Sequence, residues 1–180
     1  VALLWFCYAK VFHKTTTYNL PLYAALGKRM KAPSNIVNSL AAWNNGAGIS
    51  LSDWILCVGN YDHFIAYSRL VWPEFIEHGN RIYIADLFNQ ENIARNIENG
   101  ANEYQAQCFQ NAIDLSTIFT AAQESYDEEK LLYLANVLKS SWGASLAFKY
   151  PEREFSVFID NCLDEENVGD LIVSFGEKGT

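Results

Sequence analysis

Two acidic residues and a histidine follow Trp72-Pro73 and form the densest cluster in the sequence that could do chemistry. They are Glu74, Glu77 and His78. Proline favours the first position of a helix, so we expect residues 74–78 to form a helical turn on which Glu74 and His78 share a face. A carboxylate and an imidazole placed this way could bind a metal ion or act as an acid–base pair. The alternative is a solvated helix end that carries no chemistry.

The other candidate groups are weaker. Asp62 and His63 could join this site, but adjacent residues of a helix point about 100° apart, so we expect His63 to be a hydrogen-bonded core residue. Cys162 is the one cysteine expected in a loop, and its acidic neighbours disfavour the reactive thiolate. The four cysteines have neither a CxxC pair nor a histidine at zinc-ligand spacing, so we predict no metal site.

Signature motifs of catalysis are absent from the sequence. It contains no GxSxG, GxGxxG, Walker loop, HExxH or EF-hand pattern. We therefore favour a protein that is not an enzyme and predict no cofactor.

Residues 160–170 (DNCLDEENVGD) are the most distinctive polar stretch, with five acidic residues and no base. Three interpretations remain open: a solvated loop, a patch for a basic partner, and a calcium loop. The stretch lacks the ligand order of an EF-hand, which argues against calcium. Under the second interpretation the residues that bind the partner are Asp160, Asp164, Glu165, Glu166 and Asp170.

Charge is distributed unevenly along the chain, whose formal net charge is −8. Residues 1–60 hold five basic residues and one acid, whereas residues 121–180 hold five basic residues and twelve acids. The basic stretch 27–31 could pack against the protein's own acidic half. The acidic balance repels phosphate backbones, so we do not expect nucleic-acid binding, while a basic protein partner is compatible with it.

The composition is that of a globular domain, with 50% hydrophobic and 19% charged residues. We expect one domain over residues 1–180, and the sparse cysteines favour a reducing cytoplasm. No apolar run approaches the ~18 residues of a membrane span. The stretch 1–12 is interrupted by Lys10 and lacks the features of a signal peptide. We expect a core strand or short helix over residues 1–14, and a membrane-proximal segment is the alternative.

Hydrophobic periodicity predicts an α+β fold, mainly helical, with a small antiparallel sheet of about three strands that includes a C-terminal hairpin. Apolar residues alternate in 155–159 and again in 171–175, which predicts the hairpin. A strand is also expected at 81–87. The predicted helices cover residues 22–30, 35–43, 51–72, 89–100, 102–113 and 127–148.

Two of these helices carry further expectations. Helix 127–148, begun by a capping box at Ser125, has an apolar stripe that predicts a core helix. Helix 51–72, begun by Ser50-x-x-Asp53 and bent at Gly59, is apolar on most sides, which places it in the centre of the fold or at an interface. An interface there would make the protein a subunit of a homo-oligomer.

One part of the sequence resembles a known group of proteins. Residues 48–80 contain Trp-Ile-x-Cys-Val-Gly-Asn and end near Trp-Pro-x-Phe, and residues 151–157 read Pro-Glu-Arg-Glu-Phe-Ser-Val. Together these stretches resemble segments of an uncharacterised family of bacterial proteins. The resemblance implies a bacterial source and assigns no functional residue.

Three functions follow as hypotheses. The leading one is a non-enzymatic bacterial interaction protein, of the immunity or adaptor type, that presents an acidic face to a basic partner. The second is a metal-dependent or acid–base hydrolase centred on Glu74, Glu77 and His78. The third is the homo-oligomer subunit.

Overall fold

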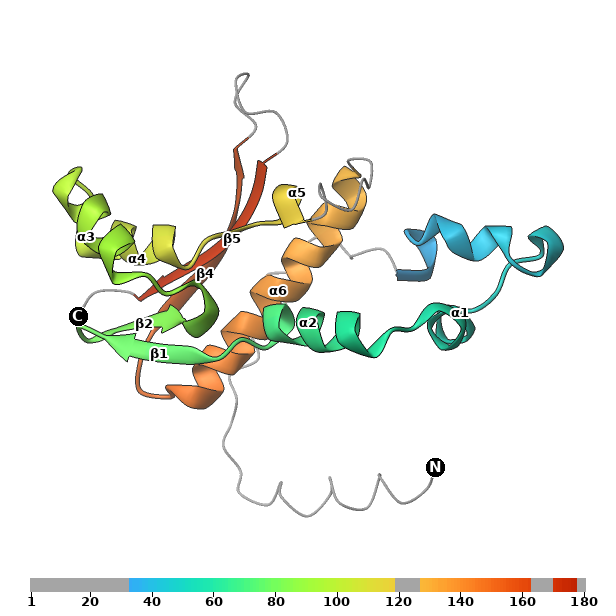
Figure 1. The fold of residues 1–180 in the computed structure, drawn as a ribbon, viewed down its shortest axis with the longest axis horizontal. Coiled ribbons are helices and arrows are strands. Elements are labelled where there is room, and N and C mark those ends of the chain that lie inside the picture. The colour runs from blue at the N-terminus through green and yellow to red at the C-terminus, as the bar shows by residue number, and fades with distance from the viewer. Residues whose placement is uncertain (1–32, 119–126, 163–169, 178–180) are drawn as a thin grey trace, which may run out of the picture. The chain divides into compact units, whose positions relative to one another are not determined.

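The computed structural model describes residues 33–118, 127–162 and 170–177 (Figure 1). All of them belong to a single unit, Ala32–Thr180. The elements predicted at 1–14 and 22–30 lie outside the described residues, and the single domain over residues 1–180 stays a prediction. Among the described residues, no helix combines the length and apolar character needed to cross a membrane.

The element order is that of a mainly helical α+β fold, which confirms the predicted class. Short 3₁₀ helices come first and recur once later: η1 Pro33–Asn35, η2 Asn38–Ala42, η3 Asn44–Gly46 and η4 Ala85–Leu87. The α-helices are α1 Leu51–Val58, α2 Tyr61–Val71, α3 Gln90–Glu98, α4 Glu103–Gln110, α5 Leu115–Ile118 and α6 Glu128–Lys149. The strands are β1 Phe75–His78, β2 Arg81–Ile84, β3 Ile113–Asp114, β4 Phe155–Cys162 and β5 Asp170–Glu177.

The predicted C-terminal hairpin is confirmed. β4 and β5 pair antiparallel over their full length, from Phe155 opposite Glu177 to Cys162 opposite Asp170. β3 pairs with the other side of β5, so the sheet has the order β3-β5-β4. Because side chains alternate across a strand, Val173 and Phe175 enter the main core while Ser174 and Gly176 face α4.

Helix α6 supplies the centre of the core, as its apolar stripe predicts. Trp142 is fully buried, and its ring lies 6.1 Å from that of Phe175 in an edge-on arrangement. The helix is capped by Asp127, whose carboxylate accepts a hydrogen bond from the Lys130 N–H, whereas the predicted cap, Ser125, lies outside the described residues. The buried residues of the main cluster are Phe75, Ile82, Ile84, Ile113, Leu115, Leu131, Ala135, Leu138, Trp142, Leu146, Leu171, Val173 and Phe175.

Two predicted helices near the N-terminal end of the described residues are wrong in form. Residues 35–43 contain 3₁₀ turns rather than an α-helix. Residues 51–72 form two helices, because Asn60 caps a new helix with its side chain 3.0 Å from the His63 N–H. The predicted start is confirmed, since Ser50 accepts from the Asp53 N–H at 3.1 Å. Helices α3 and α4 begin after Asn89 and Asn102 as expected.

The helical turn predicted at residues 74–78 is also wrong. Residues 75–78 form β1, which pairs antiparallel with β2 through a two-residue turn at Gly79 and Asn80. These two residues have φ values of 57° and 61°, the mirror-image turn geometry that matches the twist of paired strands. The strand predicted at 81–87 ends at Ile84, and it belongs to this separate two-stranded sheet.

Side-chain amides from and just after α4 join the two sheets. The Asn111 carboxamide accepts from the Ile84 N–H at 3.0 Å and donates to the carbonyls of Ile82 at 3.1 Å and Phe175 at 3.3 Å. Gln107 likewise donates to Ile82 O at 2.9 Å and accepts from the Glu177 N–H at 2.9 Å. Both side chains are fully buried. They therefore satisfy backbone groups of β2 and β5 that direct strand pairing leaves free.

Candidate functional site

The three residues of the predicted chemical cluster are held apart by β1. Glu77 and His78 are neighbours on a strand, so their side chains point to opposite faces. The His78 ring packs 5.2 Å from the ring of Phe88. Glu74 precedes the strand, and its backbone carbonyl accepts a hydrogen bond from Ala85. The sequence prediction failed here because it assumed a helical spacing that strand pairing overrides.

Glu74 is paired with Arg69 near the end of α2. The guanidinium lies 2.8 Å from Glu74 and donates two hydrogen bonds to Asp86, at 2.9 and 3.1 Å. The hydrogen bonds to Asp86 are the main cause that raises the pKa of Arg69 above its ordinary value, and the hydrogen bond to Glu74 is the next. This fork-like pairing ties the end of α2 to the segment after β2.

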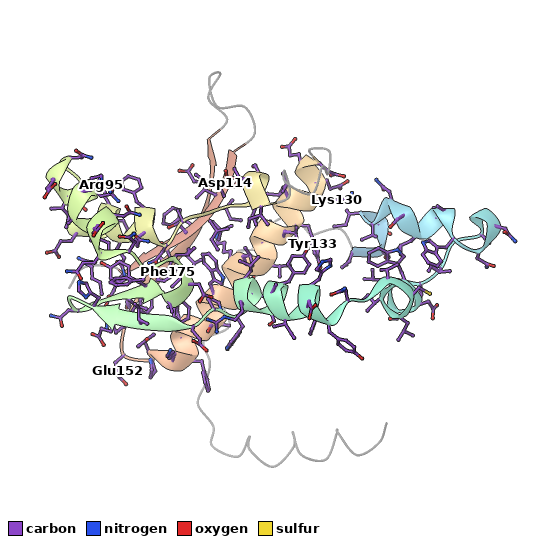
Figure 2. All side chains as sticks on the ribbon, in the orientation of Figure 1. Arg95, Asp114, Lys130, Tyr133, Glu152 and Phe175 are labelled. Atoms are coloured by element: carbon purple, nitrogen blue, oxygen red, sulfur yellow. The ribbon has the colours of Figure 1, made fainter. Side chains whose placement is uncertain are left out.

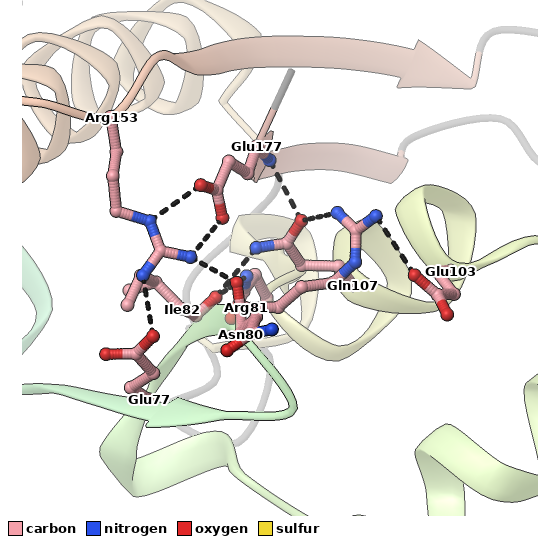
Figure 3. Close-up of polar contacts among 9 residues, drawn as sticks. Glu77, Asn80, Arg81, Ile82, Glu103, Gln107, Arg153 and Glu177 are labelled. Atoms are coloured by element: carbon pink, nitrogen blue, oxygen red, sulfur yellow. Dashed lines mark hydrogen bonds and ion pairs between the residues drawn. The ribbon is translucent and has the colours of Figure 1, made fainter. Parts of the chain in front are cut away.

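Glu77 is paired with Arg153, which lies between α6 and β4 (Figure 3). Arg153 donates to both oxygens of Glu177 at 2.6 Å, to Glu77 at 2.9 Å and to the Asn80 carbonyl. The hydrogen bonds to Glu177 are the main cause that raises the pKa of Arg153. One arginine thus links β1, the Gly79-Asn80 turn and the end of β5.

A second arginine extends this network on its other side (Figure 3). Arg81 donates to the Gln107 carboxamide oxygen at 3.1 Å and to Glu103 at 3.3 Å. Gln107 therefore uses both ends of its amide and is fully buried, whereas the carboxylates of Glu77 and Glu103 at the two ends of the network are more than half exposed.

These contacts remove the geometry on which a hydrolase at Glu74, Glu77 and His78 was predicted. The two carboxylates face different arginines, and within residues 33–118, 127–162 and 170–177 no three His, Cys, Asp or Glu side chains converge as metal ligands. His63, expected in the core, is exposed on α2 with its ring 6.1 Å from that of Tyr67. Its neighbour Asp62 is exposed too.

The feature that stands out is an exposed apolar surface on α1 and α2. Neither helix contains a buried residue. Tyr61 is 90% exposed, Leu56 84% and Phe64 76%, and Ile55 and Ile65 are also more than half exposed. We call these five residues the α1–α2 apolar face. They lie between residues 55 and 65 on two consecutive helices, and large apolar side chains that are exposed near one another mark interaction surfaces more often than isolated ones do.

The exposed charges on these two helices are negative. Their acids are Asp53 and Asp62, both exposed, and their single base, Arg69, is engaged by Glu74 and Asp86. The sequence had already indicated that residues 51–72 are apolar on most sides. Which part of that surface stays exposed depends on packing against the rest of the fold, which periodicity does not report.

The predicted acidic partner site is described only in part. Asp160 is exposed on β4, and the backbone of Asp170 begins β5. Asp164, Glu165 and Glu166 lie outside the described residues. The five acids therefore stay a prediction as a binding site.

An open groove of about 390 Å³ lies between α3 and the end of α4. None of the candidate site residues predicted from the sequence lines this groove, whereas Arg95 of α3, labelled in Figure 2, does. Its lining is mixed in polarity and comprises Leu87, Asn92, Arg95, Asn96, Phe109, Gln110 and Ala112.

Two cysteines have contrasting surroundings. Cys108 is buried, and burial raises the pKa of its thiol, which disfavours a nucleophilic role. Cys57 is exposed on α1. Cys162 ends β4 rather than lying in a loop.

Comparisons of the chain with known protein families, curated proteins and solved structures found no match. The resemblance of residues 48–80 and 151–157 to a bacterial family therefore stays a prediction.

Proposed function

We propose that the protein is a non-enzymatic interaction protein that binds a basic protein partner through the α1–α2 apolar face. The observation that carries the proposal is the exposure of Leu56, Tyr61 and Phe64 on two consecutive helices. Burying side chains of this size removes a large apolar area from water, which is the dominant favourable term in protein association. Tyrosine, here Tyr61, is one of the residue types enriched among the few positions that supply most binding energy.

Charge supports the choice of a basic partner. The acids of α1 and α2, Asp53 and Asp62, are exposed, whereas Arg69 already contacts two carboxylates. A second copy of the chain would bring the same acids toward one another, whereas a partner with Lys or Arg around an apolar groove would complement them. The predicted immunity or adaptor role is one setting in which such a partner occurs.

The five acids of residues 160–170 would add long-range attraction for the same partner. Asp160 is the one whose side chain the structure describes, and it is exposed. Attraction between exposed charges weakens as salt shortens the screening length to about 8 Å at physiological ionic strength. The complex should therefore form faster at low salt.

The test compares two double variants with the same kind of substitution. L56S/F64S removes two residues of the α1–α2 apolar face, and F109S/F148S removes two exposed phenylalanines outside it, 62% and 84% exposed. The full-length protein and each variant are used to capture partners from lysate of the producing cells. Affinity for any captured basic protein is then measured with purified components.

We expect L56S/F64S to weaken binding at least about tenfold and F109S/F148S to leave it unchanged. Equal loss in both variants would contradict a specific role of the face. Light scattering of the protein alone separates the alternative: a dimer that L56S/F64S converts to a monomer would assign the face to a homo-oligomer instead.

A further inference from the structure

The two edge strands of the three-stranded sheet, β3 and β4, differ in length. On one side β3 is a two-residue strand, Ile113–Asp114, that leads at once into α5. On the other side β4 is eight residues long, and among the described residues it pairs only with β5. Residues 155–160 of β4 include no buried residue, whereas most of β5 is buried.

One face of β4 packs on the main core and α4 lies on the other face of the sheet, which leaves one edge of β4 without a neighbouring strand among the described residues. Phe155, Val157 and Ile159 pack on the main core beneath α6. On the opposite face α4 lies close to β5, since the Ser174 hydroxyl donates to the Cys108 carbonyl at 2.6 Å. An edge strand presents N–H and C=O groups of alternate residues in the plane of the sheet, where neither helix layer lies.

β4 has few of the devices that usually block such an edge. Its eight register pairs run without a break, so it has no bulge. Its sequence, FSVFIDNC, contains no proline and no lysine. Proteins commonly protect edges with bulges, prolines or charged residues, lysine above all. Asp160 is the one charged residue of β4, so most of this long, regular edge is suited to accept another strand.

Charge around β4 indicates which strand would fit. Glu154, just before the strand, and Asp160, near its end, are both exposed. Arg153, which precedes Glu154 in the chain, forms ion pairs with Glu77 and Glu177. The strand's uncompensated charge is therefore negative at both ends, and a second copy of β4 would add acids to acids.

We propose that the free edge of β4 binds an extended basic segment of another protein, which adds to the sheet as a fourth strand. Backbone hydrogen bonds would supply the affinity, and Glu154 and Asp160 would select Lys or Arg on the incoming strand. This inference rests on the proposed function in one respect, that the partner is basic. It assigns a different surface and a different binding mode from the α1–α2 apolar face.

The test uses the full chain and a defined probe. The probe is an eight-residue peptide of alternating Lys and Val, acetylated at its N-terminus and amidated at its C-terminus. Its matched control is the same peptide methylated at alternate backbone nitrogens on one edge, which keeps the charge and removes the donors needed for pairing. Binding is measured by calorimetry, and the contact is located by hydrogen–deuterium exchange.

We expect the unmodified peptide to bind with a Kd below about 1 mM, to slow exchange in residues 155–162, and to bind about tenfold more weakly to E154K/D160K. The methylated peptide should not bind. The variant L56S/F64S should bind the peptide as the wild type does, so failure of the α1–α2 face and failure of this site are distinguishable.

Four results would overturn the proposal. Equal binding of the methylated peptide would show attraction by charge without strand pairing. Protection located outside residues 155–162, or no binding at 1 mM, would remove the site. A dimer in which β4 is protected without peptide would show that a second copy is the occupant.

Discussion

Replacing Asn111 with alanine should lower the free energy of unfolding by about 1.5–4 kcal/mol. The side chain is fully buried and makes three hydrogen bonds to two sheets. Its loss leaves the Ile84 N–H without a partner, which costs about 1–3 kcal/mol for a buried donor. The longer bond to Phe175 O adds about 0.5–1 kcal/mol, while Ile82 O keeps its bond from Gln107.

Urea unfolding followed by far-ultraviolet circular dichroism measures this change. The midpoint should fall while the slope with urea stays the same, because the surface exposed on unfolding hardly changes. The matched control is Asn92→Ala, the same substitution on exposed α3, which should change stability by less than about 0.5 kcal/mol because alanine favours helix.

The variant Asn111→Asp tests the same reasoning through pH. Its carboxyl group can still accept from the Ile84 N–H, but a negative charge would face the carbonyls of Ile82 and Phe175. Burial and these carbonyls should raise the pKa of the new carboxyl in the folded state above its unfolded value of about 3.9. The folded state then holds the extra proton, so the variant should lose stability relative to wild type as pH rises above about 4.

Two outcomes would refute this account of the amide bridge. One is an Asn111→Ala protein within about 0.5 kcal/mol of wild type, which would show that the sheets are held by other contacts. The other is an Asn111→Asp protein with the same deficit at every pH, which would show that its carboxyl is not desolvated between the strands.

Further predictions concern packing, capping and thiol access. Gly176→Ala should lower the free energy of unfolding, measured in urea, by about 1–3 kcal/mol, because a Cβ would lie 2.5 Å from the Tyr104 ring and 2.6 Å from Cys108 Sγ. Adding Tyr104→Ala to this variant should remove one of the two close contacts and so recover part of the stability lost through Gly176→Ala. Asp127→Ala should cost about 1 kcal/mol at pH 7 through loss of the α6 cap. A backbone N–H of the first turn lowers the pKa of Asp127, so its stabilising charge is present above about pH 4, and the deficit should shrink as pH falls through the lowered pKa. Peptide-resolved mass spectrometry after brief maleimide treatment at pH 7 should find Cys57 labelled and Cys108 unlabelled until urea unfolds the protein; equal labelling would contradict the burial of Cys108.

The sequence alone determined the elements whose signals are local. The alternation of apolar residues in β4 and β5 specified a hairpin, because one face of each strand must be buried. The period of α6 specified which side of the helix enters the core. Asparagine caps at Asn89 and Asn102 marked helix starts, since their side chains satisfy backbone N–H groups within three residues.

Only the tertiary structure decided whether the candidate site residues come together. Glu74, Glu77 and His78 are compatible with a helical turn by sequence, but pairing with β2 made the segment a strand. Glu77 then meets Arg153, which is 76 residues away in the chain and leaves no local trace in the sequence. The sequence also left open whether α1 and α2 are exposed. An apolar pattern shows that burial of a surface would be favourable, but it does not show which part of the fold covers that surface.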